Sequence, residues 1–316
     1  MPYEPYIPQF LGTKAFKEVA IPLLVKYIDW RFFFSAWKLS GRYEGIHEVC
    51  DCVSCEVGWL QKFSSEERPK AKEALQLYKD AQAILREVNK NKSLQVNALI
   101  GFFPGKSYNE GLLFYRDNQQ QTYIPTLRQQ EMKYDDGAYL SLCDFVSPSK
   151  DYIAAFAVTV HGAETLADSF EVTHDSYNAI LIKTIADRLA EAAAEWLHER
   201  VRKELWGFAP DENLTIDDLL KGRYTSIRPA VGYPSLPDQS VIFELDELLQ
   251  MEQIGISITE NGAMYPNASV CGIIISHPKS RYFNLGKIGT DQLQDYAHRR
   301  NSTPQQISKW LIKNID

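Results

Sequence analysis

The chain has 316 residues, of which 45% are hydrophobic and 24% are charged, values that are ordinary for a globular protein with a large core. Its formal net charge of -7 argues against a general nucleic-acid binder and against adhesion to anionic membranes. No apolar run approaches the roughly 20 residues that a membrane span needs. The first residues, Met1 to Tyr6, lack the basic and apolar regions of a signal peptide. We therefore expect a cytoplasmic protein whose partners are neither nucleic acid nor membrane.

The five cysteines are an odd number scattered along a long chain, which does not suggest a disulfide scaffold. Three of them follow His47 within nine residues, at Cys50, Cys52 and Cys55. Three thiols and an imidazole could bind zinc or part of an iron–sulfur cluster. The spacing Cys-x-Cys-x-x-Cys is not the paired Cys-x-x-Cys of common zinc sites, so we expect free or buried thiols and no metal. Metal binding remains the alternative.

The first third of the chain predicts helices followed by strands. Residues 21–39 predict two short helices that meet near Asp29 and Trp30. Residues 66–90 predict a longer helix, because apolar side chains recur at helical spacing. These side chains are Ala71, Ala74, Leu75, Tyr78, Ala81, Ile84, Leu85 and Val88. Strand-like runs follow at 96–103, 111–116 and 153–160.

One glycine-rich stretch, Gly101 to Ser107, is similar to a phosphate-binding P-loop but departs from it in two respects. A P-loop has four residues between its first glycine and the Gly-Lys pair, and this stretch has three. Pro104 also lacks the N–H that a phosphate cradle needs. No Gly-x-Gly occurs either, so the fingerprint of a Rossmann-type methyltransferase is missing. Nucleotide hydrolysis is therefore not expected.

The second half of the chain predicts one long helix over about 168–206, with Ile182, Ile185, Leu189, Ala193 and Trp196 on its buried side. Two capping boxes predict the starts of short helices, Thr215 with Asp218 and Thr303 with Gln306. Asp238 is a further helix start signal.

Strand-like segments recur at 254–259, 269–276 and 281–288. No linker is marked clearly enough to divide the chain.

The most informative segment is the loop Arg228–Pro234. Arg228 supplies a fixed cation suited to a carboxylate or phosphate. Pro229 and Pro234 restrain the backbone, and Gly232 permits a conformation or a close approach that a side chain would prevent. Tyr233 adds an aromatic face and a hydroxyl. A rigid loop of this kind is typical of binding sites; the alternative is a proline-rich turn whose arginine pairs with a surface carboxylate.

This loop is one of five motifs that occur in a characteristic order: Tyr27–Phe33, Ala186–Ala192, Leu197–Arg202, Arg228–Pro234 and Ser276–Phe283. Together they closely resemble the activation domain of cobalamin-dependent methionine synthase, over nearly the whole chain. The resemblance implies a single C-shaped α+β domain over 1–316 with antiparallel strands and flanking helices. Its N-terminal helical part would span about 1–95 and its strand-rich, cofactor-binding part about 96–316.

The resemblance also implies that the chain binds S-adenosylmethionine. It assigns the ammonium group to Asp29, the carboxylate to Arg228 and the adenine edge to the backbone at Ala230. Tyr282 and Phe283 would pack around the cofactor, and Glu191 would project toward the same cleft. Taken singly, Asp29 could instead cap a helix, and the polar helix face Asp187, Glu191, His198 and Arg202 could be a solvated stripe of ion pairs.

For partners, the resemblance implies the cobalamin-binding domain or the remainder of methionine synthase, together with a flavodoxin-like electron donor. Tyr233 would face the corrin. The Asp-x-His-x-x-Gly motif of a cobalamin-binding segment is absent from the sequence, so cobalamin would come only through a partner domain. The chain would then be an excised fragment or a protein that acts in trans. It needs no catalytic nucleophile or general base of its own.

Three departures from the family pattern concern the pocket wall. Val231 stands where the family commonly has proline, Cys271–Ile275 replaces a segment often richer in aromatic residues, and Phe283 replaces a frequent tyrosine. The competing interpretation from another class is an adaptor protein that kept the fold but no longer supports methyl transfer. Binding of S-adenosylmethionine separates the two.

Overall fold

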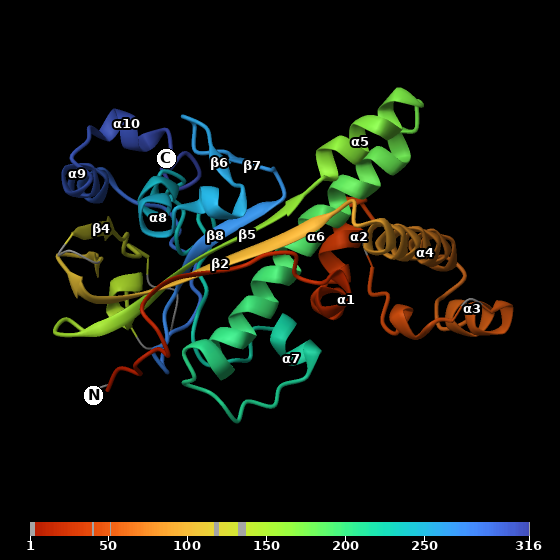
Figure 1. Ribbon diagram of the computed structural model, residues 1–316, viewed down its shortest axis with the longest axis horizontal. Coiled ribbons are helices and arrows are strands. Elements are labelled where there is room, and N and C mark those ends of the chain that lie inside the picture. Colours follow the sequence, from red (N-terminus) through yellow and green to blue (C-terminus); the bar gives the residue numbers. More distant parts are fainter. Residues whose placement is uncertain (1–3, 40, 51, 117–119, 132–136, 316) are drawn as a thin grey trace. The chain divides into compact units, whose positions relative to one another are not determined.

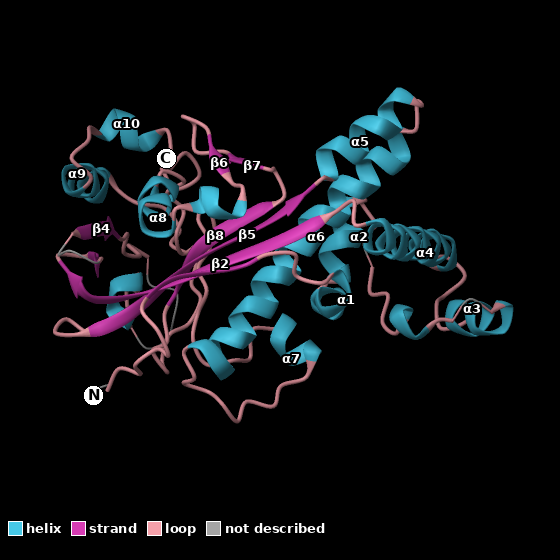
Figure 2. Cartoon of the chain, viewed as in Figure 1, coloured by secondary structure: helices cyan, strands magenta, loops and turns pink. Residues whose placement is uncertain are grey.

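The computed structural model describes the chain except for residues 1–3, 40, 51, 117–119, 132–136 and 316 (Figure 1). The chain divides into two compact units. Unit 1 comprises Met1–Lys17, Asn97–Thr159 and Ala193–Asp316, and unit 2 comprises Glu18–Val96 and Val160–Ala192. Most strand residues belong to unit 1, whereas unit 2 is mainly helical (Figure 2). Within the described residues, no helix is long and apolar enough to cross a membrane.

The strands are β1 (Gly12–Phe16), β2 (Gln95–Tyr108), β3 (Gly111–Tyr115), β4 (Gln121–Pro125), β5 (Asp151–His161), β6 (Ser257–Ile258), β7 (Met264–Tyr265) and β8 (Ser269–Ile274). The α-helices are α1 (Ile21–Leu24), α2 (Trp30–Ala36), α3 (Val53–Leu60), α4 (Arg68–Asn91), α5 (Ala163–Val172), α6 (Ser176–Arg200), α7 (Ile216–Leu220), α8 (Val241–Leu249), α9 (Thr290–Arg299) and α10 (Pro304–Ser308). Short 3₁₀ helices are η1 (Val25–Tyr27), η2 (Ile46–Glu48), η4 (Leu142–Phe145) and η6 (Met251–Ile254), and η5 (Val201–Leu205) is a π-helical turn.

Unit 1 is built on a sheet of strand order β4-β3-β2-β5-β8, to which β1 adds alongside β2. The pairs β1–β2, β2–β3, β3–β4 and β5–β8 are antiparallel. The long strands β2 and β5 and the shorter β8 run side by side in the ribbon diagram (Figure 1). Strand β5 is buried along nearly its whole length, as expected for a strand with neighbours on both sides. The predicted α+β class with antiparallel strands is thus confirmed.

The main core of unit 1 packs side chains of this sheet against α8 and the segments around it. It includes Phe114, Ile153, Leu245, Ile273 and Phe283, all at most 4% exposed. A smaller cluster lies under the C-terminal helices and contains Leu285, Ile288, Tyr296, Ile307 and Leu311.

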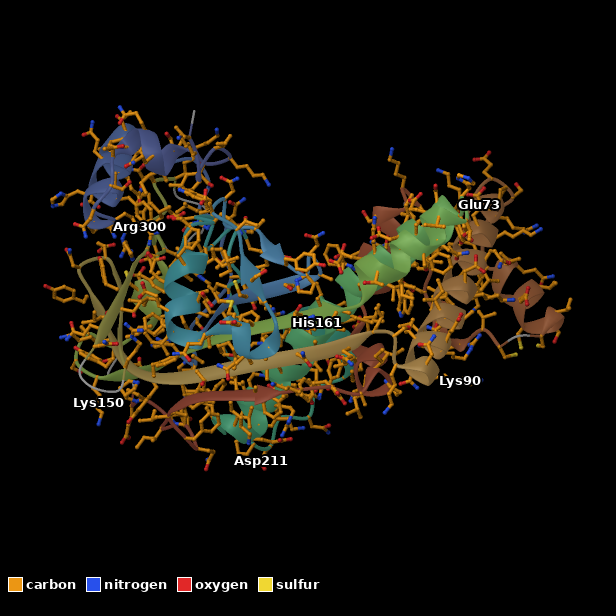
Figure 3. The ribbon with its side chains drawn as sticks, turned by 45° about the horizontal axis from the view of Figure 1, so that its top comes forward. Glu73, Lys90, Lys150, His161, Asp211 and Arg300 are labelled. Atoms are coloured by element: carbon orange, nitrogen blue, oxygen red, sulfur yellow. The ribbon has the colours of Figure 1, made fainter. Side chains whose placement is uncertain are left out.

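Buried charges connect these C-terminal helices to α8 and to the residues just before it. Arg300 donates to Glu244 Oε1 at 2.6 Å and to Ser240 Oγ at 2.7 Å (Figure 3 labels this arginine). Tyr296 Oη donates to Asp238 Oδ2 at 2.8 Å. Asp238 also accepts from the Ser240 N–H at 2.9 Å and thereby shapes the approach to α8. The sequence signal at Asp238 therefore lies just before the helix, which begins at Val241.

Unit 2 is held together by the amphipathic helix α4 and an aromatic cluster. Helix α4 buries Ala71, Ala74, Leu75, Leu77, Ala81, Leu85 and Val88. Most of this face was predicted; Tyr78 and Ile84 lie at its edge and are half-buried. The Trp30 ring of α2 packs edge-on to Tyr78 at 4.6 Å and to Phe33 at 5.1 Å. This packing explains the many aromatic residues near the start of the chain.

The long central helix is confirmed, but its start differs from the prediction. Residues 163–172 form the separate helix α5, and α6 begins at Ser176. The two are separated because His174 has a positive φ of 58° and Asp175 accepts from the Asn178 N–H at 3.1 Å, as an N-cap does. At its other end the helix continues through η5 to Leu205. Both predicted capping boxes, at Thr215 and Thr303, are present.

Two strand predictions near the C-terminus were wrong or too long. Residues 281–288 contain no strand, and 254–259 contains only the two residues of β6. In the first case the free edge of β8 is already occupied by the segment Ile227–Val231. Apolar residues of 281–288 enter the cores instead: Phe283 joins the main one, and Leu285 and Ile288 join the smaller one.

The stretch that resembled a P-loop lies inside the uninterrupted strand β2. Its Gly105 pairs with Phe114 of β3. A Cβ at this glycine would come within 2.7 Å of the Leu113 carbonyl oxygen, so close strand pairing accounts for the glycine. Because a P-loop is a turn that opens a helix, the structure excludes a P-loop here.

Candidate functional site

The loop 226–236 of unit 1 runs along the outer edge of β8. The Ile227 N–H donates to the Ile275 carbonyl at 3.2 Å, the Ile273 N–H to the Pro229 carbonyl at 3.0 Å, and the Val231 N–H to the Cys271 carbonyl at 3.0 Å. These bonds form an antiparallel ladder that covers the sheet edge. The absence of an N–H at Pro229 is tolerated because this is an edge position.

Gly272 of β8 allows the loop to approach this closely. A Cβ at position 272 would lie 2.1 Å from the Pro229 carbonyl oxygen and 2.8 Å from Ala230 Cα. Both are backbone atoms and cannot move aside without moving the whole loop. Gly272 therefore fixes the position of Arg228 and Ala230 as directly as the loop's own residues do.

Arg228 is largely buried, with 8% of its surface exposed. Its Nη2 donates to Glu195 Oε1 of α6 at 2.5 Å, and its guanidinium carbon lies 5.3 Å from the centre of the Phe156 ring. Its backbone N–H donates to the Tyr282 hydroxyl at 2.8 Å. A buried cation held by a carboxylate and a ring face is well placed to receive a second carboxylate.

The Tyr282 hydroxyl links the loop to a second tyrosine. It lies 3.2 Å from the Tyr224 hydroxyl, while 43% of the Tyr282 residue remains exposed. Burial of Tyr224, and then the nearby Glu195 carboxylate, raise the pKa of the Tyr224 phenol well above its usual value. Both effects disfavour the phenolate, so Tyr224 keeps its proton at neutral pH and can donate a hydrogen bond.

His198 of α6 contacts the start of the loop at Ser226. Its Nε2 lies 2.9 Å from Ser226 Oγ, and its ring packs edge-on to Tyr224 at 4.7 Å. Burial, followed by the positive charges of Arg202 and Arg228, lowers the pKa of His198 well below its usual value. Ser226 has a φ of 101°, a strained value for a residue with a side chain. The neutral imidazole therefore helps to hold a strained turn next to Arg228.

One turn further along, Arg202 is fully buried and pairs with Glu212. Its Nε and Nη2 donate to both Glu212 oxygens at 2.7–3.1 Å, and its guanidinium stacks 4.3 Å from the Tyr224 ring centre. The prediction that His198 and Arg202 could belong to a solvated stripe was therefore wrong. Both are interior residues whose partners, Glu212, Tyr224 and Ser226, lie beyond the end of this helix.

The far end of the loop faces solvent. Gly232 has a φ of 83°, and its N–H donates to the Leu236 carbonyl at 2.9 Å, which closes a tight turn. Tyr233, at the tip, is 49% exposed. Together with Gly232, Pro234 and Trp310, it lines a cavity of about 710 Å³. The loop thus buries its arginine and exposes its tyrosine.

The model of the vitamin B12 dependent methionine synthase activation domain matches residues 20–301. The chain belongs to this family. It is also similar to a solved structure of the MetH reactivation domain bound to AdoHcy, with 39% sequence identity and a TM-score of 0.86. That similarity covers 99% of this chain and 93% of the other. The resemblance inferred from the motifs is confirmed.

Within this activation-domain fold, four of the predicted cofactor residues lie in unit 1 around the same short ladder. Arg228 and Ala230 belong to the loop, and Tyr282 holds the loop's backbone. Phe283 is 4% exposed and belongs to the main core, whereas 43% of the neighbouring Tyr282 is exposed. Its contact with a cofactor stays a prediction.

The other two predicted cofactor residues, Asp29 and Glu191, belong to unit 2. Asp29 caps α2: its Oδ1 accepts from the Arg31 N–H at 3.0 Å, and its Oδ2 accepts from Arg31 Nη2 at 2.6 Å. Glu191 lies on α6 beside Asp187, whose pKa is raised by burial and by the charges of Glu164 and Glu191, against the lowering effect of Arg188. The cap role of Asp29 is thus present, and its cofactor role stays a prediction.

Sequence reasoning missed Glu195, although it forms the ion pair with Arg228. Its side chain is 18% exposed, and its Oε2 is buried without a hydrogen-bond partner among the described residues. A signal was available, because Glu195 lies four residues after Glu191 and hence on the same helix face. Nothing in the sequence, however, indicated that residue 228 would pack against this face.

The cysteine segment is a separate cluster in unit 2. Cys50 Sγ lies 3.1 Å from Cys52 Sγ and 2.7 Å from Cys55 Sγ. Hydrogen bonds, first from Cys55 and then from Ser54, lower the pKa of Cys52 to about 6. Those to Cys50 and Cys52 raise the pKa of Cys55 to about 12. His47 does not join this cluster within the described residues.

Proposed function

We propose that this chain binds S-adenosylmethionine and presents its methyl group for reductive remethylation of cob(II)alamin in cobalamin-dependent methionine synthase. Membership of the activation-domain family supports the proposal, as does the similarity to a domain that binds AdoHcy. The structural observation that carries it is the buried Arg228, fixed on the edge of β8 by Gly272 and Tyr282.

The residues of unit 1 fit the amino-acid end and the flat surfaces of this cofactor. Arg228 offers its cation to the carboxylate, in exchange for or in addition to Glu195. The exposed part of the Tyr282 ring offers a π face to a positively charged group. The backbone at Ala230, held against Gly272, offers hydrogen-bonding groups for the adenine edge.

When bound, S-adenosylmethionine supplies an electrophilic methyl group on its sulfonium, and the residues of this chain supply position. No side chain is asked to act as a nucleophile or general base. For Asp29 in unit 2 we propose a role toward the ammonium group of the cofactor, and for Glu191 a side chain that projects toward the same cleft, as the family resemblance implies. Asp29 can combine this role with its cap because a carboxylate has about four acceptor positions.

We further propose that cobalamin comes from a partner domain, in the cytoplasm, with a flavodoxin-like protein as electron donor. Tyr233 would then contact the corrin, since it is exposed at the loop tip while Arg228 is buried. The chain would act as a single functional domain, either within a longer methionine synthase or in trans. The rival proposal is an adaptor that kept this fold without binding the cofactor.

Calorimetry with S-adenosylmethionine tests the proposal. Arg228→Ala removes a charge-assisted hydrogen-bonding partner worth about 1.5–3 kcal/mol, so the affinity should fall by roughly 10- to 150-fold. Arg223→Ala is the matched control, because Arg223 lies five residues earlier and its side chain is 62% exposed. Wild-type protein that binds no S-adenosylmethionine would favour the adaptor. Equal affinities of wild type and Arg228→Ala would remove Arg228 from the site.

The role of Tyr233 is tested by a paired measurement with Tyr233→Ala. S-adenosylmethionine affinity should stay nearly unchanged, whereas the recovery of methionine synthase activity after cob(II)alamin formation should slow. Tyr265→Ala, at a comparably exposed tyrosine of β7, is the control. Loss of cofactor affinity with unchanged recovery would mean that the two ends of the loop were assigned the wrong way round.

A further inference from the structure

Three sulfur atoms of unit 2 meet at the start of α3. The sulfur of Cys50 is within 3.1 Å of both other sulfurs, and all three lie within 4.8 Å of one another. The three cysteines are free thiols. The spacing of these residues in sequence did not indicate a metal site, but their positions in space change that expectation.

The local backbone brings these sulfurs together. Cys52 is the N-cap of α3, and its sulfur accepts from the Cys55 N–H at 3.2 Å. The Cys52 N–H donates to the Cys50 carbonyl at 2.8 Å, which keeps Cys50 close to the start of α3. Two adjacent hydrogen bonds therefore orient all three side chains toward one point.

The scaffold beneath the cluster is anchored on two sides. Trp59 of α3 is 3% exposed, and its indole N–H donates to the Glu44 carbonyl at 2.9 Å. Glu56 forms an ion pair with Lys79 of α4. Ligands on a braced helix start keep their geometry better than ligands on an unsupported loop.

These three cysteines are more exposed than cysteines that serve only to pack a core. Cys50 and Cys55 are exposed and Cys52 is half-buried, whereas Cys143 and Cys271 of the same chain are buried. A cysteine that serves packing behaves as a small hydrophobic residue and is usually interior. Cys143 and Cys271 fit that role, and the other three do not.

From this geometry we propose that Cys50, Cys52 and Cys55 form a three-thiolate site for one soft cation, Zn²⁺ or Cu⁺. Thiolates select such cations over Mg²⁺ and Ca²⁺, which prefer oxygen. Metal–sulfur bonds of about 2.3 Å place the sulfurs of one site about 4 Å apart, so the distances from Cys50 Sγ to the other two sulfurs must lengthen by roughly 1 Å as the protons leave. Exposed side chains can make this adjustment by rotation.

The proposed site would be open. Within the described part of the chain, no further histidine, cysteine or carboxylate joins the three sulfurs. A Zn²⁺ ion would complete its coordination with water or an exchangeable ligand, whereas Cu⁺ can be satisfied by three thiolates alone. The site would consequently bind metal reversibly, independently of the cofactor site proposed in the preceding subsection.

The experiment titrates the full chain, reduced with a phosphine under anaerobic conditions, with Zn²⁺ against a chromophoric chelator and with Cu⁺ against a Cu⁺-specific chelator. We expect one equivalent of at least one ion per chain. Cys52→Ser should weaken binding by more than about 100-fold, since even the loss of a ligand's supporting partner costs 10- to 100-fold. Because serine is itself a good N-cap, this variant keeps α3 intact.

Two further variants separate the site from other thiols. Ser54→Ala removes a hydroxyl 3.3 Å from the Cys52 sulfur but no sulfur, so it should weaken binding by at most about 10- to 100-fold, less than Cys52→Ser does. The triple variant with serine at 50, 52 and 55 keeps Cys143 and Cys271 and should bind nothing. Undiminished binding by the triple variant, or less than half an equivalent of both ions on the reduced wild type, would overturn the proposal. A Cys50–Cys55 disulfide formed in air by a chain that binds no metal when reduced would overturn it equally.

Discussion

Two segments of this chain place reactive side chains in opposite ways. In unit 1 the loop 226–236 depends on residues far away in sequence. Glu195 and Tyr282 bond to Arg228, and Gly272 leaves room for the backbone of Pro229 and Ala230. In unit 2 the three thiols are brought together by bonds that span at most five residues. A site built from distant parts should be sensitive to changes anywhere in its support, whereas a local site should tolerate changes elsewhere.

The largest expected effect is that of Gly272→Ala, which tests the distant support of the loop. The added Cβ would come 2.1 Å from the Pro229 carbonyl oxygen, so the loop must move. We expect the free energy of unfolding to fall by about 3 kcal/mol, and calorimetry to detect no S-adenosylmethionine binding. Gly58→Ala in α3 is the matched control: nothing lies within 4 Å of its added Cβ, and helix propensity should stabilise it by about 0.5–1 kcal/mol. Similar effects of both changes would erase the contrast between the segments.

Tyr282→Phe tests a single distant contact. It removes the hydroxyl that accepts from the Arg228 N–H, and an unsatisfied buried N–H costs about 1–3 kcal/mol. Urea denaturation should show that loss, and calorimetry should show weaker binding of S-adenosylmethionine. Tyr139→Phe, at a tyrosine of the same 43% exposure, should change neither. Wild-type stability and affinity in Tyr282→Phe would mean that the loop does not need the hydrogen bond to this hydroxyl.

His198, the buried histidine that contacts the start of the loop, should make the free energy of unfolding depend on pH. Burial and the neighbouring arginines lower the pKa of His198 in the folded chain, so below about pH 6.5 only the unfolded chain binds this proton. The free energy of unfolding should therefore fall as the pH falls, by up to about 1.4 kcal/mol per pH unit from this residue. Denaturation curves of His198→Gln should show a smaller slope, while His47→Gln, at an exposed histidine, should retain the wild-type slope. Identical slopes for wild type and His198→Gln would assign the pH dependence to other groups.

The smallest effect on stability is expected in the cysteine segment at the start of α3. Cys52→Ala removes the N-cap of α3 and should cost about 1 kcal/mol in metal-free protein, while Cys52→Ser should stay within a few tenths of wild type. Neither change should alter S-adenosylmethionine affinity. Thermal denaturation and calorimetry on the same samples check both statements. A loss of cofactor affinity in either variant would show that the segments are coupled after all.

The sequence determined the local features of this protein because their causes are local. The capping boxes at Thr215 and Thr303 and the buried face of α4 follow from residue spacing within one or two turns. The family could also be inferred from the sequence, since its motifs keep their order along the chain.

Tertiary structure decided what spacing cannot encode. It turned the polar residues His198 and Arg202 inward, placed Glu195 beside Arg228, and gave the edge of β8 to residues 227–231 instead of 281–288. Each outcome depends on how well segments distant in sequence fit a shared surface. At the edge of β8, the glycine at position 272 leaves room for another backbone. The same holds for the thiols at a shorter range: their spacing was visible, but the convergence of three sulfurs required the helix start at Cys52.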